Sequence, residues 1–256
     1  MIICNGISLY RGKKQILSDT RLTARNGEIT VLIGKNGSGK TSLLRCIAGV
    51  YKRFSGSITF DGVPAGSLSA SRRAQTVAIM SQTLPLPRVT VKTLAEFGRQ
   101  PYLRGGRLSE NDRKAAIHAI KLAGIEAHCD DLVSELSGGE RQIAFFSMLL
   151  AQNAPAVLLD EPTANLDAEY RTRVFSIIRS MRDAGKTVVM TLHNLDDAVE
   201  LADNITVLHE GRTVFEGKPA GFITSDLPRM VFGLTPVTAR DETGEPFTVF
   251  RTNTAL

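Results

Sequence analysis

The chain has 256 residues, of which 43% are apolar and 22% are charged, and its formal net charge is +5. This length suffices for one large domain or two small ones with a full core, and the composition is ordinary for a soluble globular protein. The charge suits phosphate ligands or a cytoplasmic membrane face, but it is too small and too dispersed to indicate a nucleic-acid partner.

Three further features indicate an intracellular protein. Cys4, Cys46 and Cys129 are far apart and form no CxxC pair, so we expect neither a disulfide framework nor a zinc site. The N-terminus lacks the pattern of a signal peptide. The most apolar stretch, residues 143–162, is interrupted by polar residues and a proline, and no segment reaches the ~20 apolar residues that span a bilayer. We therefore expect a soluble, intracellular chain.

Strand-like segments dominate the first third of the sequence. The β-rich runs are residues 2–10, 16–24 and 28–34. The last run ends in the glycine-rich stretch GKNGSGKT, after which residues 40–50 have helical spacing. Further strands are predicted at 56–62 and 76–82, because Gly and Ser bound both runs.

The pattern changes at Val89 to a block of helices. The spacing predicts helices over 90–98, 109–124 and 139–152, and a Ser109/Asp112 capping pattern opens the middle one. Beyond the block, the sequence predicts strands at 156–162, 187–193, 204–211 and 212–217, a helix at 168–185, and a hairpin turning around Glu242–Gly244. This order predicts an α/β core, residues 1–86 and 154–235, interrupted by a helical block at 87–153 and followed by a hairpin-like extension at 236–256.

The stretch from Gly34 to Thr41 fits the phosphate-loop pattern G-x-x-x-x-G-K-[ST], with a strand before it and a helix after it. Its glycines let backbone N–H groups surround phosphates at a helix start. Lys40 is expected to reach the β- and γ-phosphates, and the Thr41 hydroxyl to ligate Mg²⁺. The alternative is a glycine-rich turn with a surface lysine. The predicted nucleotide-binding residues here are Gly34, Lys35, Asn36, Gly37, Ser38, Gly39, Lys40, Thr41 and Ser42.

The segment AVLLDE supplies acidic residues at the end of a buried strand, where ligands of open α/β sheets collect. Asp160 is placed to hold Mg²⁺ through water, and Glu161 to orient the attacking water. A solvated acidic turn is the alternative for such a dipeptide alone. The phosphate loop elsewhere in the chain favours the catalytic reading.

The segment LSGGE, residues 136–140, raises the question of a second phosphate site. Ser137 and Glu140 have the spacing of a capping box, and a capping role alone would account for these two residue types at these positions. Capping does not require Gly138 and Gly139, which weaken the first turn of a helix. Two glycines make sense if another group approaches the backbone closely.

Taken together, the ordered motifs, from the phosphate loop through LSGGE and LLDEP to the histidine at 193, resemble the ATP-binding cassette (ABC) ATPases over nearly the whole chain. The resemblance implies an ATP hydrolase with a single P-loop NTPase (RecA-like) domain, containing an antiparallel β subdomain and an inserted helical subdomain. It also implies a head-to-tail homodimer, in which Ser137, Gly138, Gly139 and Glu140 of one copy bind the ATP of the other. That dimer would explain the second phosphate site.

The resemblance assigns roles to four more residues. Tyr10 matches an aromatic ring that stacks on adenine, and Gln82 matches a residue that senses Mg²⁺ and the attacking water. Asp167 matches a loop that crosses the dimer interface, and His193 matches a switch histidine on the γ-phosphate. The implied catalytic set is Lys40, Gln82, Glu161 and His193, and the implied Mg²⁺ set is Thr41, Gln82 and Asp160.

The sequence departs from the family pattern in two places. Position 140 is Glu where the family usually has Gln, so a carboxylate would stand near the partner's phosphates unless it caps its own helix. The segment that follows LSGGE also lacks a second basic residue common in the family, and we have no physical account of that change.

The stretch GRQPY, residues 98–102, and the C-terminal tail resemble those of importers for ferric siderophores, haem or cobalamin. The resemblance implies two membrane-spanning permease subunits, with Arg99 to Tyr102 near the groove that receives one of them. It further implies an extracytoplasmic binding protein and a peripheral location on the cytoplasmic side of the inner membrane, with no nucleic acid. The alternatives are an exposed basic loop at 99–107, a soluble cassette ATPase acting on nucleic acid or the ribosome, an importer of another substrate class, or a P-loop kinase.

Overall fold

A computed structural model describes residues 1–103 and 105–252, so Arg104 and the last four residues of the predicted extension, 253–256, lie outside the described residues. A six-stranded sheet with the strand order β10-β9-β3-β8-β7-β6 forms the centre of the fold. All neighbours in it are parallel except β9 and β10. The predicted α/β class is confirmed. The strands of this central sheet are β3 (Ile29–Ile33), β6 (Val77–Met80), β7 (Ala156–Asp160), β8 (Thr187–Thr191), β9 (Asn204–His209) and β10 (Arg212–Gly217).

The central strands are buried on both faces, as parallel strands between helical layers must be. Alternate residues of β3 enter two different cores: Ile29, Val31 and Ile33 face the core built with the later helices, whereas Leu32 faces the core shared with the first helix and the N-terminal strands. This is why these strands are continuous apolar runs rather than alternating ones. Among the helices that pack on the sheet are α1 (Lys40–Ile47), α6 (Ala168–Asp183) and α7 (Leu195–Leu201).

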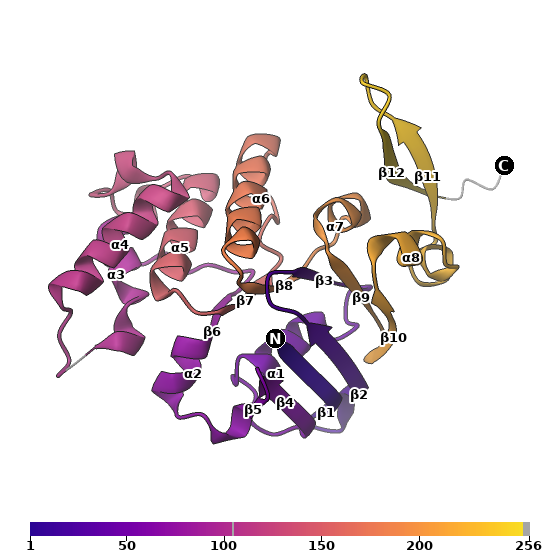
Figure 1. Cartoon of the computed structure of the whole chain (residues 1–256), viewed down its shortest axis with the longest axis horizontal. Coiled ribbons are helices and arrows are strands. Elements are labelled where there is room, and N and C mark those ends of the chain that lie inside the picture. Colours follow the sequence, from indigo (N-terminus) through magenta and orange to yellow (C-terminus); the bar gives the residue numbers. More distant parts are fainter. Residues whose placement is uncertain (104, 253–256) are drawn as a thin grey trace.

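A second, antiparallel sheet lies beside α1, with the strand order β2-β1-β4-β5 (Figure 1). Its long first two strands form a hairpin whose buried side chains alternate with exposed ones. A short helix, α2, follows this sheet and was not predicted. The bounds are β1 (Ile2–Arg11), β2 (Lys14–Ala24), β4 (Ser55–Phe60), β5 (Val63–Pro64) and α2 (Ala70–Thr76).

The predicted helical block is present as α3 (Val91–Phe97), α4 (Glu110–Ala123) and α5 (Gly138–Gln152), which lie together at one end of the molecule (Figure 1). The Ser109/Asp112 capping box that opens α4 is confirmed. Where the chain divides into subdomains stays an interpretation.

The C-terminal part forms α8 (Pro219–Ile223), a π-helical turn (Pro228–Phe232) and the hairpin of β11 (Leu234–Arg240) and β12 (Pro246–Thr252). The hairpin turn at residues 241–245 confirms the turn predicted around Glu242–Gly244. The helices α2, α7 and α8, of five to seven residues each, were not predicted.

Candidate functional site

The glycine-rich loop joins the end of β3 to the start of α1, as the sequence predicts. Gly39 is the N-cap residue of α1 with a left-handed φ of 104°, and a Cβ at this position would lie 2.6 Å from a methyl carbon of Leu17. Since glycine has no side chain, the cap accepts no hydrogen bond from the first turn of the helix. The N–H groups at the start of α1 therefore remain available to an anion.

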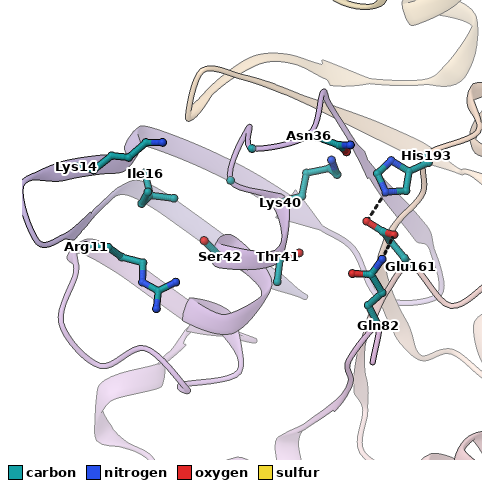
Figure 2. A pocket seen from close by; sticks show the side chains of 12 residues that line it. Arg11, Lys14, Ile16, Asn36, Lys40, Thr41, Ser42, Gln82, Glu161 and His193 are labelled. Atoms are coloured by element: carbon teal, nitrogen blue, oxygen red, sulfur yellow. Dashed lines mark hydrogen bonds and ion pairs between the residues drawn. The ribbon is translucent and has the colours of Figure 1, made fainter. Parts of the chain in front are cut away.

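The side chain of Lys40 lies across this loop (Figure 2). Its ammonium group donates to the backbone oxygens of Gly34, at 2.7 Å, and Lys35, at 3.3 Å, and only 6% of the residue is exposed. Burial lowers the pKa of Lys40, while the carboxylates of Glu161 and Asp160 oppose that shift. A buried cation held by carbonyl dipoles is well placed to exchange them for phosphate oxygens.

Asp160, at the end of β7, is fixed by two hydroxyl groups. Thr41 Oγ1 and Thr191 Oγ1 each donate to its Oδ1 at 3.0 Å. The carboxylate is almost fully buried. Thr41 and Asp160, both predicted as Mg²⁺ ligands, are thus brought together, and their oxygen atoms are the type that Mg²⁺ prefers.

Glu161 is the centre of a second network (Figure 2). Gln82 Nε2 donates to its Oε2 at 2.5 Å, and His193 Nε2 lies 2.5 Å from its Oε1. The backbone of Glu161 has φ 52°, and its N–H donates to Thr191 Oγ1 at 2.8 Å. A positive φ is uncommon for a residue with a side chain, and here it turns the carboxylate from the strand end toward Gln82 and His193.

These groups surround a pocket of about 460 Å³, a volume in the range of small-molecule sites. Besides the predicted residues, the hairpin of β1 and β2 contributes Arg11, Lys14 and Ile16 (Figure 2). The full lining is Arg11, Lys14, Ile16, Asn36, Gly37, Gly39, Lys40, Thr41, Ser42, Gln82, Glu161 and His193.

The pocket fits a nucleotide phosphate chain with Mg²⁺. Gly37 has a positive φ and its missing side chain leaves open space. The N–H groups at the start of α1 and the Lys40 ammonium group supply donors, so the loop has both the room and the donors for phosphate oxygens. Ser38 Oγ is buried without a hydrogen-bond partner in the described part of the chain, but Ser38 does not line the pocket.

The structure places Tyr10 at the side of this pocket rather than in it. Tyr10 is 58% exposed and lines a neighbouring hollow together with Arg11, which belongs to both. Its stacking on adenine stays a prediction.

The start of α5 is built differently from the start of α1. Ser137 Oγ accepts from the N–H of Glu140 at 3.3 Å, and Glu140 Oε2 accepts from the N–H of Ser137 at 2.9 Å, which is the capping box. The side-chain hydrogen bond with Ser137 lowers the pKa of Glu140, and His128 Nε2 lies 3.4 Å from its other oxygen. Glu140 therefore caps its own helix.

The two glycines of LSGGE have different surroundings. A Cβ at Gly139 would lie 2.3 Å from the ring of Tyr170, whereas one at Gly138 would meet no heavy atom within 4 Å. The close approach expected from the sequence is thus made at Gly139 by this chain itself. Gly138 faces open space.

Asp167 acts locally as the N-cap of α6. Its Oδ1 accepts from the backbone N–H of Tyr170 at 2.9 Å. Tyr170 is also the residue whose ring covers Gly139. In the described part of the chain, neither Asp167 nor residues 137–140 line the pocket of the glycine loop. Within one chain, the predicted ATP-binding residues therefore form two separate groups: the glycine loop with its pocket, and residues 137–140 with Asp167.

Arg99, in the segment after α3, is not part of an exposed basic loop, which was the alternative interpretation of this segment. Arg99 donates to the Ala151 oxygen at 2.8 Å, pairs with Asp112 at 3.0 Å, and stacks on the Tyr102 ring at 3.9 Å. The Tyr102 hydroxyl donates to the oxygen of Gln152 at 2.9 Å. These contacts join the ends of α3, α4 and α5.

Sequence reasoning missed Arg11, Lys14, Ile16 and Thr191. A signal existed for the first two, because the basic cluster YRGKK directly follows the predicted strand that carries Tyr10. Nothing in the sequence marks Ile16 or Thr191. Among the residues described, no three His, Cys, Asp or Glu side chains gather in a way that would hold a metal ion by themselves.

Comparison with known proteins gives consistent matches. Residues 17–164 match the family model described as ABC transporter. A probable siderophore transport system ATP-binding protein of Bacillus subtilis (strain 168) is 35% identical, with 92% of this chain and 86% of that protein covered. A hemin import ATP-binding protein of Rhodococcus jostii (strain RHA1) is also 35% identical, with 90% and 78% covered.

A dimeric bacterial ABC transporter cassette of known structure is 26% identical, with a TM-score of 0.76 over 86% of this chain and 99% of that one. None of the helices in residues 1–103 and 105–252 combines the length and the apolar character needed to cross a membrane.

Proposed function

This chain belongs to the ABC transporter family, and on that premise we propose that it is the ATP-hydrolysing subunit of an importer for a metal chelate such as a ferric siderophore, haem or a cobalamin. The names of the siderophore and hemin relatives support this substrate class. The observation that carries the hydrolytic part is the network in which Gln82 and His193 both hold the Glu161 carboxylate beside the glycine loop.

In this proposal the residues of the pocket divide the work. The backbone of the glycine loop and Lys40 bind the phosphates, and Thr41 and Asp160 hold Mg²⁺, which when bound offsets negative charge on the phosphates. Glu161 orients a water molecule and accepts its proton, while Gln82 and His193 keep its carboxylate aimed into the pocket. His193 also donates to a terminal phosphate oxygen.

The chain works as a pair, because its own pocket lacks the start of α5. In the proposed head-to-tail dimer, the open backbone at Gly138 and the hydroxyl of Ser137 face the ATP of the second copy, and Asp167 lies at the interface. The dimeric cassette of known structure supports this arrangement. ATP binding would close the pair and hydrolysis would reopen it.

The permease subunits would receive this motion through the helical block. A hollow of about 590 Å³ lies between the end of α1, α2 and Gln152. Ser71 and Gln75 of α2 donate to the Pro101 oxygen, so the Arg99–Tyr102 segment borders this region. We assign the hollow to a cytoplasmic helix of a permease. The chain would then sit on the inner face of the membrane, and an extracytoplasmic protein would deliver the chelate.

The test combines purification with transport. The tagged chain is extracted from its native membranes in mild detergent, and its partners are identified by mass spectrometry. We expect a stoichiometric protein with many membrane-spanning helices, and loss of chelate uptake in cells that carry Glu161→Gln. Recovery of the chain alone, or with ribosomes or DNA, would overturn the importer; unchanged uptake would overturn the energising role.

A further inference from the structure

The position of His193 depends on α7, because only Asn194 separates the two. His193 is in the connection from β8 to α7, and its side chain is 49% exposed, so few neighbours fix the ring. The Asn194 side chain caps α7 by accepting from the N–H groups of Asp196 and Asp197. A helix of seven residues has little stability of its own, so what holds α7 also sets where His193 lies.

Two other parts of the fold hold α7. On one side, α6 contributes Arg171, whose guanidinium lies 3.2 Å from the buried carboxylate of Asp197. On the other side, β12 packs on α7, and the N–H of Phe250 donates to Asp196 Oδ1 at 2.8 Å. The C-terminal hairpin therefore contacts the first turn of the helix that follows His193.

The hairpin is anchored firmly enough to act as a support. The ring of Phe250 lies 6.0 Å from that of Phe222, which is fully buried in the main core. Phe222 in turn contacts Phe215 of β10 and, edge to face, Phe232 just before the hairpin. Such aromatic packing is favourable beyond simple burial. The hairpin of β11 and β12 projects beyond α8 at the edge of the molecule (Figure 1).

From these contacts we infer that the C-terminal hairpin, residues 234–252, is a positioning element for His193, and that Asp196 is the residue through which it acts. The hydrogen bond from Phe250 fixes the first turn of α7, and α7 keeps the His193 ring within reach of Glu161. This inference rests on the hydrolytic role proposed for His193.

The test measures kcat and KM for ATP hydrolysis by the purified full-length chain. Asp196→Ala removes the acceptor and is expected to lower kcat about 3–10-fold, as for a partly misplaced catalytic group, with KM within about twofold. Asp196→Asn keeps an oxygen that can accept from Phe250, so it should restore kcat to near the wild-type value. Phe247→Ala changes an exposed residue of the same strand and serves as the matched control.

A double variant separates positioning from general damage. In the His193→Ala background, measured with protein in excess over ATP, Asp196→Ala should cause no further loss. The inference is overturned if Asp196→Ala leaves kcat unchanged, if Asp196→Asn is as slow as Asp196→Ala, or if the losses simply multiply in the double variant. If His193→Ala itself hydrolyses ATP at the wild-type rate, the role of His193 in the proposed function is wrong, and the inference falls with it.

Discussion

The starts of α1 and α5 are alike in sequence, since glycines lie at the N-cap of α1 and in the first turn of α5, but they are completed in different ways. At α1 the cap is Gly39, which has no side chain, so the first turn keeps its N–H groups for a ligand. At α5 the Ser137/Glu140 capping box already occupies donors of the first turn, and Gly139 is covered by Tyr170. The comparison shows that α1 carries a pocket formed within one chain, whereas the chain itself leaves the space beside Gly138 of α5 open.

The sharpest test of the prepared pocket is Glu161→Gln. Removing the proposed general base should lower the rate of ATP hydrolysis about 10²–10⁴-fold while ATP binding persists, because Gln keeps the size of the side chain but not its proton affinity. Phosphate release and nucleotide binding measure the two effects, with the exposed Glu200→Gln as control. A rate within threefold of the wild type would remove Glu161 from catalysis.

The next largest effect is expected from Lys40→Ala. Loss of a charged donor to the phosphates should weaken ATP binding roughly 10–100-fold, the equivalent of about 1.5–3 kcal/mol. Calorimetric titration with a non-hydrolysable ATP analogue measures this, and Lys218→Ala, with a side chain that is 64% exposed, is the control. Equal affinities in the two variants would contradict the assignment.

Gly139→Ala and Gly138→Ala form a pair that tests the other side of the comparison. The methyl group at 139 must displace the Tyr170 ring, so we expect a loss of about 1–3 kcal/mol in the free energy of unfolding. At 138 the added methyl group has room, and the higher helix propensity of Ala should leave stability equal or raise it by up to about 1 kcal/mol.

Denaturant unfolding separates the two glycine variants, and ATP-dependent dimerisation in the Glu161→Gln background completes the test. If Gly138→Ala is stable but no longer dimerises with ATP, its open face serves a second copy. If it both folds and dimerises normally, the function assigned to that face is wrong.

Tyr10→Ala should have a smaller effect, because the side chain lies beside the pocket rather than in it. Stacking on adenine contributes roughly 1 kcal/mol, so we expect ATP to bind about fivefold more weakly. Comparison of ATP with inorganic triphosphate isolates the base, since only ATP binding should change. An unchanged affinity for ATP would exclude Tyr10 from the site.

The smallest effect is expected from Glu140→Gln, because Gln at this position also completes a capping box. In the wild type, the hydrogen bond with Ser137 lowers the pKa of Glu140. The carboxylate therefore stabilises the folded chain above the unfolded pKa of about 4.3, and this stabilisation is lost as the pH falls through the lower pKa of the folded state. The free energy of unfolding of the variant should therefore be about 0.5 kcal/mol lower than that of the wild type at pH 7, and the two values should become equal in acid. A difference independent of pH would contradict this account.

The motifs were predictable because each depends on a local pattern. The phosphate loop, the capping boxes at Ser109 and Ser137, and the C-terminal turn are fixed by residues a few positions apart. The same locality explains what was missed: Thr191 holds both Asp160 and the N–H of Glu161, yet nothing in its own neighbourhood marks it. The exposed basic loop that was the alternative for Arg99 is not found, because this side chain contacts Asp112 of α4 and the Ala151 oxygen of α5, and no local pattern indicates those partners.

The sequence alone therefore determined the α/β class, the order of the elements and the residues of the glycine loop, because apolar periodicity and glycine positions act over short stretches of chain. Only the tertiary structure decided that Gly139 is covered by Tyr170 and that the C-terminal hairpin reaches the helix behind His193. The first contact joins residues 31 positions apart and the second joins residues 54 positions apart, and no local preference specifies either of them.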